Sequence, residues 1–174
     1  MDRPHEDVMA EIRKVSLLYA IAEDRLALDT EDLAGGITRL WLTQRLCRAL
    51  VTALVPMLQQ VVTLKLPAGA ETAAQSWEQA AAMADFGKTP GVQPGPDMTA
   101  GLVTAVHISP PGEQMTLTFD FGDGESRIVT LSVAALRQTL SVMHRLQAEA
   151  GWPLDIWPAW IADPAATAVS GGVN

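Results

Sequence analysis

Hydrophobic and polar residues alternate in three stretches near the start of the chain. Apolar residues occupy every second position at Val15, Leu17, Tyr19 and Ile21, and leucines one residue apart follow at positions 26 and 28 and at 40 and 42. A period of two is typical of strands with one buried face. The pattern predicts three strands, and for residues 6–22 a helix is the alternative because leucine also favours helices.

From position 44 the apolar residues recur every fourth position instead. Leu46, Leu50, Leu54 and Leu58 follow Thr43, whose hydroxyl suits the N-cap of a helix. The spacing predicts a helix from about residue 44 to residue 62.

Most of the circumference of this first helix is apolar. Its polar side chains form one narrow stripe, which consists of Arg45, Arg48, Thr52 and Gln59. A helix with so wide an apolar arc needs cover on more than one side. We expect it to lie at the centre of the fold, between two sheets, or at the contact of a homodimer.

The same order of elements recurs downstream. Alternation over residues 103–108, 115–121 and 128–131 predicts three more strands, and Ser132 precedes a further helix that ends near residue 150. When the chain is shifted by 89 positions against itself, the two segments align without a gap, and Thr43 pairs with Ser132. The sequence therefore predicts an α+β fold of two β-β-β-α repeats, about residues 15–62 and 103–150, related by internal duplication, with coincidence in a leucine-rich chain as the alternative.

The two predicted repeats are joined by residues 63–102. This linker contains a candidate helix at about residues 72–86 and then a segment rich in proline and glycine. Residues 163–174 are mostly small and predict a flexible tail. We expect residues 1–174 to form one domain.

The second repeat's helix has the pattern of an ordinary surface helix. Its apolar stripe of Leu136, Leu140, Met143 and Leu146 lies opposite Arg137, Gln138, Ser141 and Arg145. One face of this helix is therefore expected to be in solvent.

Composition and charge narrow the classes of protein. The chain has 174 residues, of which 48% are hydrophobic and 18% charged, and its formal charge is −8. Residues 67–174 hold only four basic side chains against eleven acidic ones, which argues against double-stranded nucleic acid as a partner. The N-terminus lacks the apolar segment of a secretory signal, so a cytoplasmic protein without a membrane contact is expected.

No motif indicates catalysis, a metal or a cofactor. The single cysteine, Cys47, occupies an apolar helix position and is expected in the core. Asp120, Asp123 and Glu125 offer oxygen ligands for calcium, but the Asp123-Gly124 pair is also what a hairpin turn requires, and we favour the turn. The expected cofactor is none, and the expected catalytic residues are none.

Three of the five tryptophans lie close together near the C-terminus, at Trp152, Trp157 and Trp160. In one interpretation these rings close the core of their own subunit. In the other they anchor a protein partner, because tryptophan is enriched in binding hot spots.

Three functions are consistent with these features. The favoured one is a non-enzymatic interaction or assembly module that binds a protein partner or a second copy, with Trp152, Trp157, Trp160, Trp41, Arg45 and Arg48 as partner-binding residues. The order of elements also resembles that of Whirly-type proteins, which implies single-stranded nucleic acid bound by a basic and aromatic patch of Arg39, Trp41, Arg45 and Arg48. The third is a small-molecule binder or enzyme with a cleft between the repeats.

Overall fold

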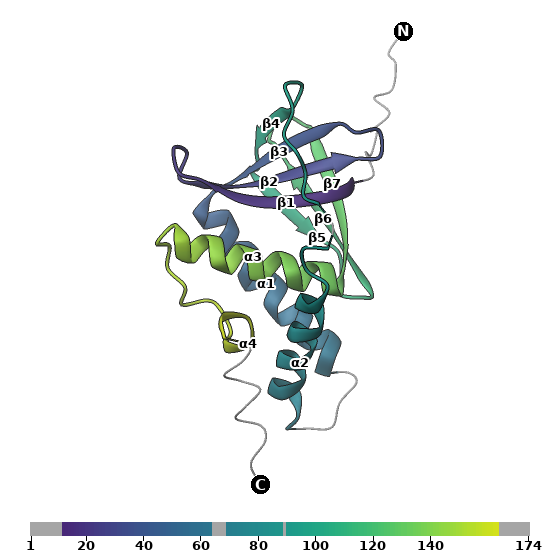
Figure 1. Ribbon diagram of the computed structural model, residues 1–174, viewed down its shortest axis with the longest axis vertical. Coiled ribbons are helices and arrows are strands. Elements are labelled where there is room, and N and C mark those ends of the chain that lie inside the picture. The colour runs from purple at the N-terminus through teal and green to yellow at the C-terminus, as the bar shows by residue number, and fades with distance from the viewer. Residues whose placement is uncertain (1–11, 64–68, 89, 164–174) are drawn as a thin grey trace.

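The computed structural model describes residues 12–63, 69–88 and 90–163, and in these residues seven strands form two sheets (Figure 1). The first sheet contains, in this order, β1 (Ile12–Ala20), β2 (Arg25–Asp32), β3 (Ile37–Leu42) and β4 (Thr99–Leu102). The second sheet contains β5 (Ala105–Ile108), β6 (Gln114–Asp120) and β7 (Ser126–Ser132). The helices are α1 (Gln44–Thr63), α2 (Glu71–Ala84), α3 (Val133–Glu149) and α4 (Ala159–Ala162).

The predicted period of two sets the register of the first sheet. Leu17 pairs with Leu28, and Leu28 pairs with Leu40, so these leucines share one face. The strand prediction for the first stretch is confirmed over Ile12–Ala20. Residues 1–11, which include the start of the alternative helix, lie outside the described residues.

Strand β4 was not predicted, and it joins the two sheets. It pairs in parallel with β3, although its sequence, Thr-Ala-Gly-Leu, shows no alternation. A Cβ atom on Gly101 would lie 2.6 Å from the ring of Phe121, so only glycine fits where the sheets meet. Directly after β4, the N–H of Thr104 donates to the carbonyl of Asp120 at 2.8 Å, and the chain continues as β5 of the second sheet.

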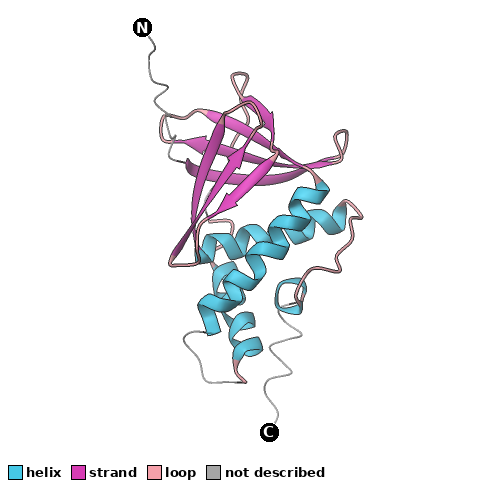
Figure 2. Cartoon of the chain, turned by 180° about the vertical axis from the view of Figure 1, so that it is seen from behind, coloured by secondary structure: helices cyan, strands magenta, loops and turns pink. Residues whose placement is uncertain are grey.

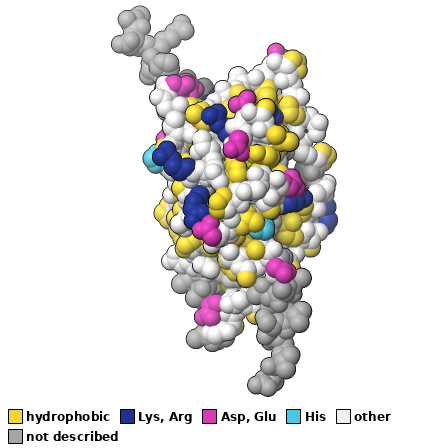
Figure 3. Space-filling model, turned by 90° about the vertical axis from the view of Figure 1, so that its left-hand side faces the viewer, with side chains coloured by type: hydrophobic (Ala, Val, Ile, Leu, Met, Phe, Trp, Pro, Cys, Tyr) yellow, Lys and Arg dark blue, Asp and Glu magenta, His cyan; other side chains and the backbone are white. Residues whose placement is uncertain are grey.

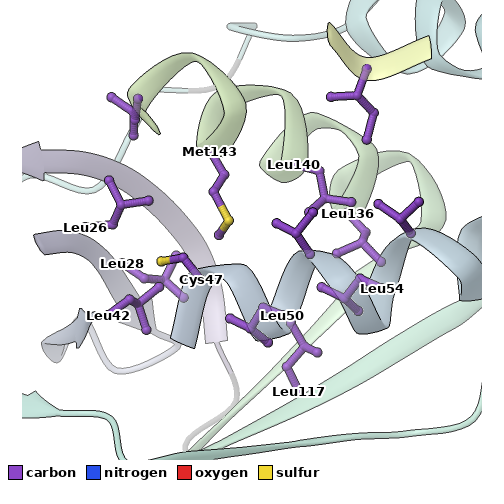
Figure 4. Packing of buried hydrophobic residues seen from close by; sticks show 14 of the residues in the cluster. Leu26, Leu28, Leu42, Cys47, Leu50, Leu54, Leu117, Leu136, Leu140 and Met143 are labelled. Atoms are coloured by element: carbon purple, nitrogen blue, oxygen red, sulfur yellow. The ribbon is translucent and has the colours of Figure 1, made fainter. Parts of the chain in front are cut away.

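All helices lie on one side of the sheets, where they cover a common core (Figure 2). Side chains from both sheets, α1 and α3 form one cluster of buried residues, including Leu26, Leu50, Leu117 and Met143. Figure 4 shows Met143 directed from α3 toward α1 and the strands. Because both predicted repeats contribute to the same core, neither of them buries its apolar face alone.

Helix α1 has the predicted exposed polar stripe, since Arg45, Arg48, Thr52 and Gln59 are all exposed. Pro56 lies on this exposed side. By length and composition alone, residues 44–62 also satisfy the criteria for a membrane span, with a mean hydropathy of 1.2. In the fold, this helix supplies Cys47, Leu50 and Leu54, among others, to the core.

The expectation that α3 has one face in solvent holds only for part of that face, because Ala134 and Arg145 are exposed whereas Arg137 is buried. Helix α2 packs against the polar side near the start of α3, where Arg137 is only 1% exposed and donates to Gln75 of α2. The sequence of α2 provides polar partners there, because Gln79 donates from Nε2 to the hydroxyl of Ser141 at 2.6 Å. Because the contacting side chains on α2 and α3 are polar, the hydrophobic pattern does not predict that these two helices pack together. Near the other end of α3, Gln147 is 2% exposed and accepts a hydrogen bond from Trp157 of the C-terminal segment.

The α+β class and the repeated order of three antiparallel strands and a helix are confirmed. Internal duplication is not confirmed: the first sheet has an additional parallel strand, and β1 has nine residues where β5 has four. The predicted tail at residues 163–174 lies outside the described residues except for Asp163.

Candidate functional site

A cleft lies between the two halves of the fold, where β1 approaches β7 and α3. It has two adjoining parts with volumes of about 370 and 360 Å³. Both parts are lined by the same six residues, which are Val15, Phe86, Gly87, Gly91, Ala135 and Gln138. Volumes in this range are typical of small-molecule sites.

The walls of the cleft follow from local features of the sequence. Alternation along β1 places Val15 and Leu17 on the inner face of the sheet, against the core. Strand β7 continues into α3 without a loop, and Ser132 caps the helix by accepting a hydrogen bond from the N–H of Ala135 at 3.1 Å. Ala135 and, one turn later, Gln138 therefore line the cleft.

The outer side of the cleft is formed by the segment that follows α2, residues 85–88 and 90–92, which we call the strap. The N–H of Val92 donates to the hydroxyl of Ser16 at 2.7 Å, and Val92 is buried. A Cβ atom on Gly91 would lie 2.7 Å from the same oxygen, so the close approach requires glycine. Next to the strap, Gln138 donates from Nε2 to the carbonyl of Ala82 at 2.6 Å. The strap is thus bonded directly to β1, and the helix α2 that precedes it is bonded to α3.

Two neighbouring cations of β1 line the cleft and share one carboxylate. Arg13 lies 3.3 Å and Lys14 lies 3.6 Å from the carboxylate oxygens of Glu31. One carboxylate carries one negative charge, so this group keeps a net positive charge.

The other charged residues lining the cleft, Arg145 and Asp85, each have a partner of opposite sign, Glu149 and Lys88. Within the described residues, the lining and its ion-pair partners therefore comprise four cations and three carboxylates. This excess is local, because the chain as a whole carries −8. On the face drawn in Figure 3, acidic and basic side chains are interspersed among apolar ones without a block of one sign.

Behind the cleft, toward the core, lies an apolar void of about 20 Å³. Val15, Leu17 and Leu131 line both the cleft and the void. The one polar side chain on the void, Thr139, donates its hydroxyl hydrogen to the carbonyl of Ala135 at 2.8 Å. The inner wall of the cleft is consequently apolar and backed by incompletely filled space.

The three C-terminal tryptophans do not line this cleft. Trp152, Trp157 and Trp160 are between 4% and 8% exposed and belong to the core of their own subunit. Trp152 donates from Nε1 to Asp24 at 3.0 Å, and Trp157 donates to the side chain of Gln147 at 3.0 Å. As packed here, the rings close the core.

Two of the three arginines of the predicted basic patch, Arg39 and Arg48, form ion pairs. Arg39 binds Asp29 through two hydrogen bonds of 2.7 Å and lies 5.3 Å from the centre of the Trp41 ring. Arg48 binds Asp155 through bonds of 2.7 and 2.6 Å, which raise the pKa of Arg48 and lower that of Asp155.

The third arginine of that patch, Arg45, is exposed on α1. The structure brings Arg39 and Trp41 together. Arg48 instead links α1 to the C-terminal segment through its ion pair with Asp155. Partner binding by these residues stays a prediction.

Cys47 and the acidic hairpin, the groups that the sequence offers for chemistry, occupy structural positions. Cys47 is fully buried, and burial raises the pKa of its thiol to about 12, so the nucleophilic thiolate is not formed near neutral pH. No group of three or more histidine, cysteine or acidic side chains is placed to hold a metal ion in the part of the chain that the structure describes. Asp123 accepts a hydrogen bond from the N–H of Glu125, as expected for a hairpin turn.

The hydrophobic pattern does not single out the residues that line the cleft. Arg13 and Lys14 precede the first clear alternation. Phe86 stands at the end of the helix predicted at residues 72–86, but α2 ends at Ala84, and Gly91 lies in the predicted linker. The sequence does contain one signal for the strap, the cluster of glycine and proline residues after α2. Glycine lets a segment cross closely over a sheet, as Gly91 does at Ser16.

Comparison with protein-family models, with curated proteins and with solved structures yields no match.

Proposed function

We propose that this protein is a non-enzymatic binding module that takes a small molecule into the cleft between its two halves. The observation that carries this proposal is the cleft itself, which combines two parts of about 370 and 360 Å³ with an apolar inner wall. Small-molecule sites are concave, mostly apolar and supplied with a few polar groups. Here Gln138, Ser132 and Thr130 supply polar groups at the wall.

A dye that fluoresces in apolar sites, 8-anilinonaphthalene-1-sulfonate, tests the proposal. We expect saturable binding to the wild type and a large loss of affinity in Ala135→Phe, because the added ring fills the cleft. Ala134→Phe is the matched control, since Ala134 is exposed on the same helical turn and does not line the cleft. Equal binding by wild type and both variants would place the dye elsewhere and refute the proposal.

The second candidate is self-association, favoured by an exposed tryptophan on α2. Trp77 is 69% exposed, and the same helix face carries Ala73, Ala80, Ala81 and Ala84, all exposed. A large ring beside small residues is complementary to itself across a twofold axis, because each ring can pack on the alanines of the other copy. Light scattering during size-exclusion chromatography should show a dimer that Trp77→Ala abolishes, and a monomer at high concentration would exclude this candidate.

Internal duplication of the β-β-β-α unit also stays a proposal. It is supported by the repeated order of elements and by the helix caps Thr43 and Ser132, which stand at matching places. The cleft between the units would then lie at the junction of two related halves.

A further inference from the structure

We propose that the cleft selects an amphipathic anion, a molecule with one carboxylate-type head and an aliphatic body; this rests on the small-molecule binding proposed above. The head would lie beside Arg13 and Lys14, and the body along Val15 and Leu131 toward the apolar void.

The charge of the cleft favours an anionic head. Glu31 is shared between Arg13 and Lys14 at 3.3 and 3.6 Å, both longer than the contacts of 2.6–2.7 Å in the Arg48–Asp155 pair. A second carboxylate can therefore approach these cations without breaking a short bond. Charge-assisted hydrogen bonds of this kind are about twice as strong as neutral ones.

The N-terminus of α3 also favours an anionic head in the cleft. Ser132 and Ala135 line the cleft, and the first turn of the helix contains no acidic side chain. The positive end of the helix dipole therefore faces the cleft, and no acidic side chain in the first turn neutralises it. An anion is favoured over a cation at this position.

The shape and lining of the cleft favour an aliphatic body. The lining residues of β1 extend from Ile12 to Leu17, a length of about 16 Å at the usual rise of a strand. Phe86 from the strap and Val142 from α3 add apolar surface on the other sides. A flexible aliphatic chain can follow this apolar path along β1.

Calorimetry with three ligands of equal chain length tests the selectivity: decanoate, 1-decanol and decyltrimethylammonium, each below its aggregation limit and at low ionic strength. We expect decanoate to bind at least about tenfold more tightly than 1-decanol and the cation to bind least, because only the anion pairs with β1. Raising the salt concentration should weaken decanoate binding and leave 1-decanol unaffected.

Paired variants identify the residues responsible. Arg13→Gln/Lys14→Gln should lower the affinity for decanoate about tenfold and leave that for 1-decanol unchanged. Arg45→Gln/Arg127→Gln removes the same charge from residues that do not line the cleft, and it should change neither affinity.

The possible outcomes separate this inference from the proposed function. Equal affinities for all three ligands, or equal losses in both double variants, would refute anion selection and leave small-molecule binding intact. If none of the three ligands binds and the dye also fails to bind, both proposals are wrong.

Discussion

Single residues in this protein have roles that their neighbours in the sequence do not reveal. Arg137 is the clearest case: its guanidinium is buried, donates at 2.6 Å to the side chain of Gln75, and lies 4.9 Å from the centre of the Trp160 ring. No carboxylate of the described residues forms an ion pair with it, and burial lowers its pKa. Amide oxygens and an aromatic face contact the guanidinium directly, and the charge of the Glu78 carboxylate, although not in an ion pair with it, also favours the charged form.

His144 provides a pH dependence at the residue scale. It is half-buried, its ring lies 5.2 Å from that of Trp157, and burial lowers its pKa below 6.5. As the pH falls through 6.5, the unfolded chain therefore binds a proton more readily than the folded chain does. We expect the contribution of His144 to the free energy of unfolding to decline as the pH is lowered from 7.5 to 5.

Urea denaturation followed by tryptophan fluorescence at several pH values measures this effect. His144→Gln removes the titrating group, so its stability should depend less on pH than that of the wild type. His107→Gln is the comparison, because it also removes an imidazole, but one that is exposed on β5 and lies 2.9 Å from Asp120; its removal should not reproduce the effect of His144→Gln. An identical pH dependence in wild type and His144→Gln would contradict the assignment.

At the scale of elements, short local signals determine where helices begin and end. Thr43 and Ser132 accept hydrogen bonds from the backbone N–H three residues later, as their positions before the helices predict. Gly151 ends α3 with φ of +70°, and the N–H of Trp152 returns to the carbonyl of Gln147 at 2.9 Å. This is a Schellman motif, and it directs the chain toward the tryptophan-rich segment.

The Schellman motif predicts the effect of one substitution. Gly151→Ala should lower the free energy of unfolding by about 1 kcal/mol, because alanine is strained at positive φ. Gly95→Ala is the matched control, since Gly95 has no positive φ and nothing within 4 Å of an added Cβ atom. Urea denaturation of both variants checks the prediction, and equal stabilities would show that α3 ends without help from Gly151.

At the scale of the whole molecule, the two halves share one core and are held together by the β4–β5 connection. The C-terminal segment adds links across the fold, since Arg48 of α1 binds Asp155 and Trp152 binds Asp24 in the β1–β2 turn. Asp24 adopts φ of +47° and also accepts a hydrogen bond from Tyr19 at 2.8 Å. A unit of this kind is expected to unfold as a whole.

We therefore predict one cooperative unfolding transition. Far-UV circular dichroism reports on all elements, and tryptophan fluorescence reports mostly on the C-terminal segment, which holds three of the five tryptophans. The two signals should have the same urea midpoint. Two separated midpoints would show that the halves are independent folding units, in contradiction to the shared core.

The sequence by itself determined most of the local order of this protein. A period of two reflects burial of one face and predicts the strands other than β4. A period near four behind a capping hydroxyl predicts α1 and α3, and the Asp123-Gly124 pair predicts a hairpin turn, in which Gly124 adopts positive φ. Only the tertiary structure decided which elements became neighbours. The burial of α3 under α2, the parallel pairing of β4 and the cleft under the strap all depend on contacts between distant segments, and these leave no periodic signal in the chain.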